Sequence, residues 1–64
     1  MKEFYVELVY NDGSTNNFYV KVDGAEYEYM ALLLRITRGT LMASSAKSAT
    51  CYNDEGFDVC SYVK

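Results

Sequence analysis

The sequence contains no histidine, only two cysteines, and no glycine-rich segment of the kind that cradles phosphate groups. Histidine is the commonest general base and metal ligand, so its absence removes the usual activator of a catalytic nucleophile. Two cysteines nine residues apart are too few, and too widely spaced, for a structural zinc site. The remaining catalytic candidates are isolated carboxylates such as Glu7 and Asp58, which we expect to be solvated. The composition therefore predicts a protein that is not an enzyme and holds neither a cofactor nor a metal.

Long apolar runs are also missing, since none approaches the roughly 18 residues that a membrane-spanning helix needs. The opening segment MKEFYVEL carries an acid at position 3 and interrupts its apolar residues, so we do not expect a signal peptide. Nine acids against six bases give a net charge of −3, which disfavours sequence-independent binding to nucleic-acid phosphates. We therefore expect a cytoplasmic protein that binds neither membranes nor nucleic acids.

The 64 residues are enough for one domain, spanning residues 1–64, with a small core. A chain of this length buries only about 60% of the surface that its unfolded form exposes. Half of the residues are apolar, which favours a folded chain over a disordered one. Efficient packing, a partner or self-association is expected to supply the rest of the stability.

Two segments near the start alternate apolar and polar residues with a period of two, which predicts strands over residues 3–10 and 16–22. The intervening NDGS, at residues 11–14, is a strong turn signal. For the two apolar faces to coincide, even positions must pair with even positions. We therefore predict a loop of three or five residues around Gly13.

The segment DGAE at residues 23–26 has the form of a helix capping box, with Asp23 as the N-cap. On this basis, replacing Asp23 with alanine should cost about 1 kcal/mol. The helix is predicted to run to about Arg38 and to stop at a left-handed Gly39. Leu41 and Met42 are expected to close the end of the core. The predicted core face comprises Ala25, Tyr29, Leu33 and Ile36, flanked by Met30 and Leu32; the opposite face comprises Glu28, Ala31, Arg35 and Arg38, with Tyr27 and Leu34 on the border.

Residues 46–53 and 57–63 are predicted to form a second hairpin around NDEG, with a type I turn followed by a left-handed Gly56. The order strand, strand, helix, strand, strand predicts an α+β fold of ββαββ type: a four-stranded, mostly antiparallel sheet with one helix packed on one face. Pairing Asn53 with Phe57 places Cys51 opposite Val59, so that Cys51 points inward and Cys60 outward. Side chains on opposite faces of a sheet cannot form a disulfide, so we predict two free thiols.

The alternation sorts the strand residues into two faces. The helix side is predicted to hold Phe4, Val6, Leu8, Phe18, Val20, Val22, Ala49, Cys51, Phe57, Val59 and Val63. The outward side is predicted to hold Tyr5, Glu7, Val9, Tyr19, Lys21, Ser48, Thr50, Tyr52, Asp58, Cys60 and Tyr62. Each strand thus contributes one outward tyrosine.

Two explanations of these tyrosines remain open. They can serve only to stabilise an exposed sheet, because cross-strand aromatic pairs contribute roughly 0.2–1 kcal/mol each. They can also form a docking surface, since tyrosine is enriched at interface hot spots. In the second case we expect the partner-binding residues to be Tyr5, Glu7, Tyr19, Tyr52, Asp58 and Tyr62.

Aromatic residues on a helix-free, four-stranded sheet also occur in single-stranded RNA platforms. Those modules have the order βαββαβ, and this outward face sets Glu7 and Asp58 against Lys21 without a basic groove. A protein partner or self-association therefore fits the composition better than nucleic acid.

Very short, acidic, single-domain α+β chains that have a tyrosine-bearing surface and no catalytic residues resemble small phage-encoded anti-defence or host-takeover proteins, such as anti-CRISPR inhibitors. The resemblance covers the whole chain in size, charge and architecture, and no residue motif carries it. It implies a protein that binds and inhibits or modulates a host protein in the host cytoplasm. Some such inhibitors mimic nucleic acid, which the six interspersed bases disfavour. The alternative is a structural homo-oligomer, such as a homodimer, whose sheets pack face to face.

Overall fold

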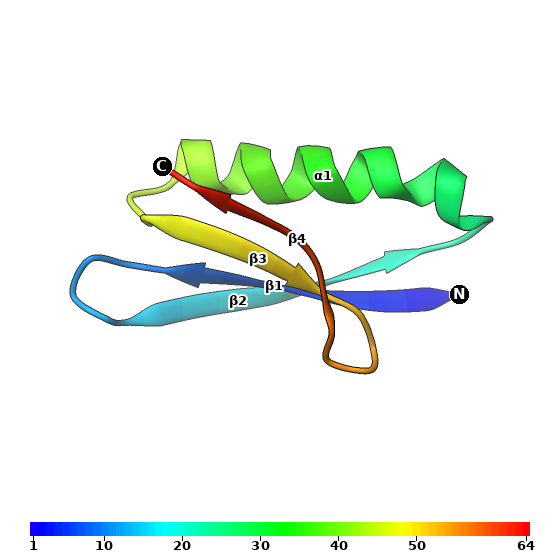
Figure 1. Ribbon diagram of the computed structural model, residues 1–64, viewed down its shortest axis with the longest axis horizontal. Coiled ribbons are helices and arrows are strands. Elements are labelled where there is room, and N and C mark those ends of the chain that lie inside the picture. The colour runs from blue at the N-terminus through cyan, green and yellow to red at the C-terminus, as the bar shows by residue number, and fades with distance from the viewer.

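The computed structural model describes all residues from 1 to 64. It contains four strands and one helix. The strands are β1 (Lys2–Val9), β2 (Thr15–Val22), β3 (Ser48–Tyr52) and β4 (Asp58–Val63), and the helix is α1 (Glu26–Ala43). Neighbouring strands are all antiparallel, in the order β2-β1-β3-β4. The helix lies across one face of this sheet (Figure 1). The predicted ββαββ order and α+β fold are confirmed.

The first hairpin has the odd loop that its alternation requires. Even positions of β1 lie opposite even positions of β2, as with Val6 and Phe18. The backbone N–H of Tyr10 donates to the carbonyl of Ser14 at 2.9 Å, which closes a three-residue loop. Gly13 in this loop has φ 87°, a conformation that glycine adopts readily. The apolar faces of β1 and β2 therefore coincide as predicted.

The start of α1 differs from the prediction, because Ala25 and not Asp23 is the N-cap. Gly24 has φ 103°, so the chain turns there and the helix starts after it. The Oε1 atom of Glu28 accepts a hydrogen bond from the backbone N–H of Ala25 at 3.1 Å. Asp23 instead lies 3.4 Å from the amino group of Met1, in an exposed ion pair.

The end of α1 also differs, because Gly39 lies inside the helix with a negative φ. The helix continues to Ala43, and the Ser44 hydroxyl donates to the carbonyl of Leu41 at 3.0 Å. The buried residues of α1 recur every four positions, at Tyr29, Leu33, Thr37 and Leu41. Burial of Leu41 contributes about 1.5–3 kcal/mol, which exceeds the cost of about 1 kcal/mol for a glycine within a helix.

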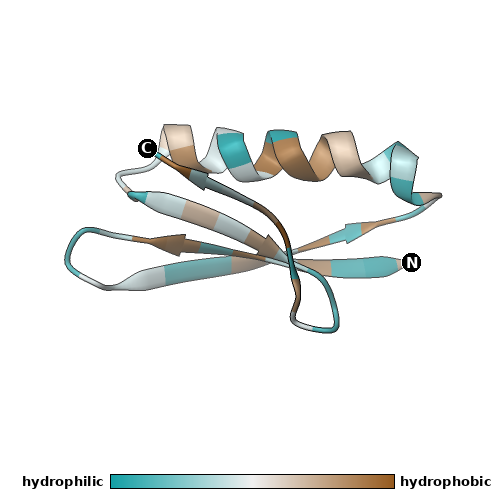
Figure 2. Ribbon diagram, viewed as in Figure 1, coloured by the Kyte–Doolittle hydropathy of each residue, from teal (hydrophilic) through white to brown (hydrophobic).

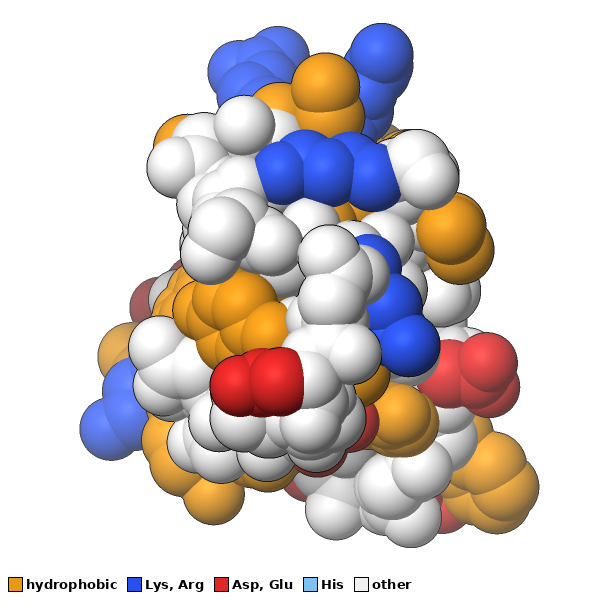
Figure 3. Space-filling model, turned by 90° about the vertical axis from the view of Figure 1, so that its left-hand side faces the viewer, with side chains coloured by type: hydrophobic (Ala, Val, Ile, Leu, Met, Phe, Trp, Pro, Cys, Tyr) orange, Lys and Arg blue, Asp and Glu red, His pale blue; other side chains and the backbone are white.

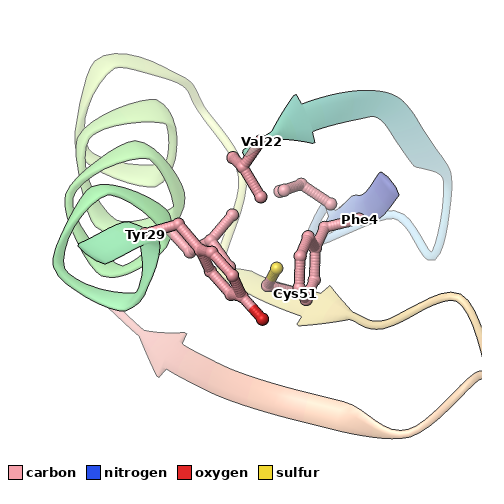
Figure 4. Packing of buried hydrophobic residues seen from close by; sticks show 6 residues of the cluster. Phe4, Val22, Tyr29 and Cys51 are labelled. Carbon is pink, nitrogen blue, oxygen red and sulfur yellow. The ribbon is translucent and has the colours of Figure 1, made fainter. Parts of the chain in front are cut away.

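The core consists of two groups of buried side chains between α1 and the sheet. The larger cluster comprises Phe4, Val6, Val22, Tyr29, Leu33 and Cys51, and the smaller cluster comprises Leu8, Leu41, Ala46 and Ala49. Figure 4 shows Tyr29 of the helix directed toward Phe4 and Cys51 of the sheet. The rings of Phe4 and Tyr29 lie 5.4 Å apart.

Three details of the predicted core face of the helix are corrected. Thr37 is fully buried, and its hydroxyl donates to the carbonyl of Leu33 at 2.7 Å, so that no polar group is left without a partner. Ala25 precedes the helix and is exposed. Met42 is 63% exposed, so Leu41 alone closes the end of the core.

The helix does not cover the sheet evenly. It lies closest to β3 and β4, so Phe18 and Val20 of the outer strand β2 are only half-buried although they face the core side. Figure 2 shows apolar residues in the central turns of α1 and in the strands beneath it. The sheet therefore has one partly covered face and one face without any helix.

The turn of the second hairpin has the predicted form. The backbone N–H of Asn53 donates to the carbonyl of Phe57 at 2.8 Å, and Gly56 has φ 88°. Beyond the turn, however, the register shifts: Tyr52 lies opposite Asp58, but Cys51 lies opposite Cys60. One residue of β4, Val59, is therefore left without a partner, which is a β-bulge. The predicted pairing of Cys51 with Val59 is wrong.

The bulge reverses the faces of the residues that follow it. Cys60 and Tyr62 pack against the core clusters from the helix side, where we expected them to face outward. Val63 is 80% exposed and Phe57 is 66% exposed, so neither belongs to the core. Because Val59 also packs against the larger cluster, the bulge lets two successive residues, Val59 and Cys60, contribute to it.

A bulge also bends its strand. The turn between β3 and β4 projects beyond the sheet on the side away from α1 (Figure 1). The helix-free face of the sheet consequently has a wall along one side.

The position of Gly39 generates the first prediction. We expect Gly39→Ala to stabilise the protein by up to about 1 kcal/mol, because alanine is the better helix former. An added Cβ would meet no atom within 4 Å. The thermal midpoint should rise by roughly 4–8 °C. Gly56→Ala is the matched control: the space is equally open, but its φ of 88° makes alanine destabilising. A fall in the midpoint of Gly39→Ala would show that α1 ends before this residue.

The helix start generates the second prediction. Ala25→Ser should stabilise the protein by about 1 kcal/mol, since a serine N-cap accepts a hydrogen bond that alanine cannot. Asp23→Ala should change the free energy of unfolding by no more than about 0.5 kcal/mol, because it removes only an exposed ion pair. Urea denaturation of both variants measures the two effects. A full kcal/mol lost in Asp23→Ala would restore Asp23 as the cap.

Candidate functional site

Three tyrosines form a row across the sheet on the face away from α1. Tyr5, on the inner strand β1, lies directly opposite Tyr19 of β2 and Tyr52 of β3. The ring centroids of Tyr5 and Tyr19 are 5.3 Å apart with the planes at 64°, and those of Tyr5 and Tyr52 are 6.0 Å apart with the planes at 51°. Such edge-on and tilted arrangements are favourable for aromatic pairs. The row is therefore held together by its own contacts.

Glu7 lies two residues from Tyr5 along β1 and faces the same side. Its neighbours across the strands, Asn17 and Thr50, are both neutral. The only ion pair in the protein joins the Met1 amino group to Asp23, and no side chain donates a hydrogen bond to Glu7. Glu7 is a half-buried residue whose carboxylate has no ion-pair partner in the protein.

The row of tyrosines lies in an open hollow of about 470 Å³. Its floor and sides include the three tyrosine rings, Glu3 and Glu7 of β1, and residues Asn53, Asp54 and Gly56 of the β3–β4 turn. The turn is fixed by the Oδ1 atom of Asn53, which accepts hydrogen bonds from the backbone N–H groups of Glu55 and Phe57, each at 2.9 Å. We call this feature the tyrosine hollow.

The tyrosine hollow is electronegative. Crowding by neighbouring protein atoms raises the pKa of the Tyr5 hydroxyl, and the charge of Glu7 raises it further, with contributions from Tyr19 and Tyr52. The ring therefore stays neutral at physiological pH. Lys21 lies opposite Glu3 across the strands but forms no ion pair with it. Three carboxylates, those of Glu3, Glu7 and Asp54, line the hollow without a bound cation from the protein.

Basic side chains gather elsewhere on the molecule. Arg35 and Arg38 are exposed on α1, and Lys64 donates a hydrogen bond to the carbonyl of Ser44 just after the helix. Figure 3, which views the molecule from one end, shows Lys and Arg side chains mainly toward the helix side and acidic side chains toward the sheet. The first turn of α1 also carries two exposed acids, Glu26 and Glu28, so the helix side bears charge of both signs.

The structure brings together four of the six residues predicted for partner binding: Tyr5, Glu7, Tyr19 and Tyr52. Asp58 is exposed opposite Tyr52 but does not line the hollow. Tyr62 is a correction, because the bulge turns it toward the helix, where it packs against the smaller cluster. The sequence prediction omitted Glu3 and Asp54. Glu3 could have been identified from the sequence, because it is two positions from Tyr5 in the same strand and so faces the same side. Asp54 reaches the hollow only because the hairpin bends.

The two thiols are also closer than predicted. Cys51 and Cys60 lie directly opposite each other on the core side, and both are unlinked. The argument that placed them on opposite faces is therefore wrong. The thiol of Cys60 donates to the Thr37 hydroxyl at 3.7 Å. Burial raises the pKa of Cys51 to about 11, so this thiol stays protonated and is a poor nucleophile at neutral pH.

A comparison with protein-family models, curated proteins and solved structures finds no match to this chain. The structure contains no helix that is both apolar and long enough to cross a membrane. It also contains no cluster of three or more histidine, cysteine, aspartate or glutamate side chains placed to hold a metal ion.

The thiols generate the third prediction. Without reductant, iodoacetamide should label both cysteines of the protein unfolded in denaturant. In the folded protein at neutral pH, Cys51 should resist labelling, since it is fully buried and its raised pKa keeps it protonated. The half-buried Cys60 should react faster. Intact mass and peptide mapping count and locate the labels. A denatured protein that takes up no label would instead contain a disulfide between these two residues.

Proposed function

We propose that this protein is a non-enzymatic binding protein that inhibits or modulates a partner protein, and that the partner docks over the tyrosine hollow. The observation that carries this proposal is the row formed by Tyr5, Tyr19 and Tyr52 on the helix-free face. Tyrosine offers a large contact area with little side-chain entropy to lose, and it is enriched at interface hot spots. Because the rings already contact one another, binding would restrict few additional side-chain motions and would cost little conformational entropy.

The dimensions of the molecule support this proposal. A typical protein interface buries about 800 Å² on each partner. The whole accessible surface of this protein is 4261 Å², so such an interface would cover about a fifth of it. The helix-free face of a four-stranded sheet is a surface of that order. A partner that covers it would engage the hollow together with the wall formed by the β3–β4 turn.

Within this proposal, the protein acts as a phage-type inhibitor of a host defence protein or host enzyme in the host cytoplasm. The support is the resemblance in size, acidity and architecture to phage-encoded inhibitors. An inhibitor that acts by occupying a surface needs no catalytic group, which agrees with the absence of histidine. Blocking a partner stoichiometrically requires only a stable, accessible and complementary face.

Self-association is the second candidate function, and the exposed edges of the sheet favour it. β2 and β4 lie at the two ends of the strand order, and neither has a further strand beside it. Unpaired edges of this kind can add a strand from another chain. Sizing chromatography with light scattering separates the two functions, because a mass that stays monomeric at all concentrations excludes the oligomer.

The proposed function generates the fourth prediction. We expect Tyr19→Ala to leave the protein folded by circular dichroism and to weaken binding of the partner at least tenfold. Tyr19 is 64% exposed, so its removal costs little folding energy, whereas a hot-spot tyrosine contributes about 2 kcal/mol or more to binding. The partner is first captured from a bacterial lysate and identified by mass spectrometry. Its affinity for each purified variant is then measured by calorimetry.

Tyr27→Ala is the matched control for this experiment. Tyr27 is 83% exposed on α1, so the same side chain is removed from the opposite layer of the molecule. Its affinity for the partner should stay within twofold of the wild type. A loss of binding in Tyr27→Ala alone would move the docking site to the helix flank at Tyr27 and Leu34. Unchanged binding in both variants would mean that the tyrosines only stabilise the sheet.

A further inference from the structure

We infer that the tyrosine hollow binds the guanidinium group of an arginine side chain presented by the partner protein. This inference rests on the proposed function and specifies the chemistry of the partner. Aromatic rings and uncompensated carboxylates line the same open hollow. That combination suits a planar cation better than an apolar or an anionic group.

The rings supply the first part of the recognition. Cations are attracted to the faces of tyrosine rings within about 6 Å of the ring centroid. The ring plane of Tyr5 is inclined by 64° to that of Tyr19 and by 51° to that of Tyr52. Inclined planes leave parts of the ring faces open to the hollow. A guanidinium group can stack on one ring while its edge approaches the next.

The carboxylates supply the second part. Glu7 is half-buried beside Tyr5 and has only neutral neighbours across the strands, Asn17 and Thr50. Its carboxylate has no ion-pair partner within the protein. A guanidinium group can donate two parallel hydrogen bonds to it, an arrangement that is stronger than a hydrogen bond between neutral groups. Glu3 and Asp54 add negative charge at other points of the hollow.

No basic side chain of the protein forms an ion pair with a carboxylate of the hollow. Lys21 is the only basic residue on the outward face, and it pairs with none of the acids there. Arg35 and Arg38 belong to α1, which lies on the other face of the sheet. The charge of the hollow is therefore available to a second molecule. Arginine is favoured over lysine because the ammonium group is compact, strongly hydrated and unable to stack.

The fifth prediction tests this with the full chain and defined probes. The probe is the tripeptide acetyl-Gly-Arg-Gly-amide, and it is compared with the same peptide containing lysine or citrulline. Citrulline keeps the planar shape of arginine but lacks its charge. In ¹H–¹⁵N NMR titrations, the arginine peptide should shift signals around Tyr5, Glu7, Tyr19 and Tyr52. Its dissociation constant should be at least tenfold lower than that of the citrulline peptide, and also lower than that of the lysine peptide.

Two variants locate the effect. Glu7→Gln should weaken binding of the arginine peptide about tenfold, because it removes the charge and keeps the shape of the side chain. Glu26→Gln removes one acid from α1, on the other layer of the molecule, and should change the affinity less than twofold. Equal affinity for the arginine and citrulline peptides, or equal losses in the two variants, would overturn the inference.

The outcomes also separate this inference from the proposed function. If Tyr19→Ala weakens binding of the partner but the arginine peptide does not shift the hollow, the docking face stands and the arginine inference fails. If the peptide binds the hollow but the partner is insensitive to Tyr19→Ala, the proposed function fails instead. If the protein associates with itself and Arg35→Gln with Arg38→Gln abolishes that association, the cation comes from a second copy and not from a different partner.

Discussion

A single unpaired residue, Val59, determines how the second half of this protein is arranged. Up to Asp58 the hairpin follows the register of its turn, and from Cys60 onward every residue of β4 lies one position out of that register. The shift lets both Val59 and Cys60 contact the larger cluster, and it places Tyr62 rather than Val63 against the smaller one. In a protein with only eleven buried residues, these extra apolar contacts are a substantial share of the core.

The same bulge shapes the opposite face of the sheet. β1, β2 and β3 keep an unbroken register at the tyrosines, so Tyr5, Tyr19 and Tyr52 lie in one line. The bulge removes Tyr62 from this face and bends the β3–β4 turn beyond the sheet, so that Asp54 approaches the row. The sequence predicts four tyrosines on this face, whereas the structure has three tyrosines in a hollow with an acidic rim. Core packing and the shape of the proposed docking site are thus consequences of one irregularity.

Alternation predicts the faces of a strand only where its odd and even positions, the two phases, differ clearly in hydrophobicity. In β1 one phase contains Phe4, Val6 and Leu8, while the other contains two acids, Glu3 and Glu7, beside Tyr5 and Val9, so the two faces can be told apart. In residues 57–63 one phase contains Phe57, Val59 and Val63, while the other contains Cys60 and Tyr62, so both phases have apolar residues. Periodicity cannot detect a bulge between two such phases. The helix ends were mispredicted for a related reason: local signals at Asp23 and Gly39 were outweighed by the turn at Gly24 and by burial of Leu41.

The tyrosines can both stabilise the sheet and form a docking surface, because the individual rings contribute differently to the two roles. Tyr5 contacts a ring on each side, and such cross-strand pairs contribute roughly 0.2–1 kcal/mol each, so its removal would weaken both the sheet and the hollow. Tyr19 pairs with only one other ring, that of Tyr5, lies on the outer strand and is mostly exposed. Its contribution to folding is accordingly the smaller one, while its ring remains available to a partner. Tyr5, at the centre of the row, therefore contributes both to folding and to the proposed binding site. At the edge of the row the two contributions can be measured apart, because substitution of Tyr19 distinguishes a ring that only stabilises the sheet from one that binds.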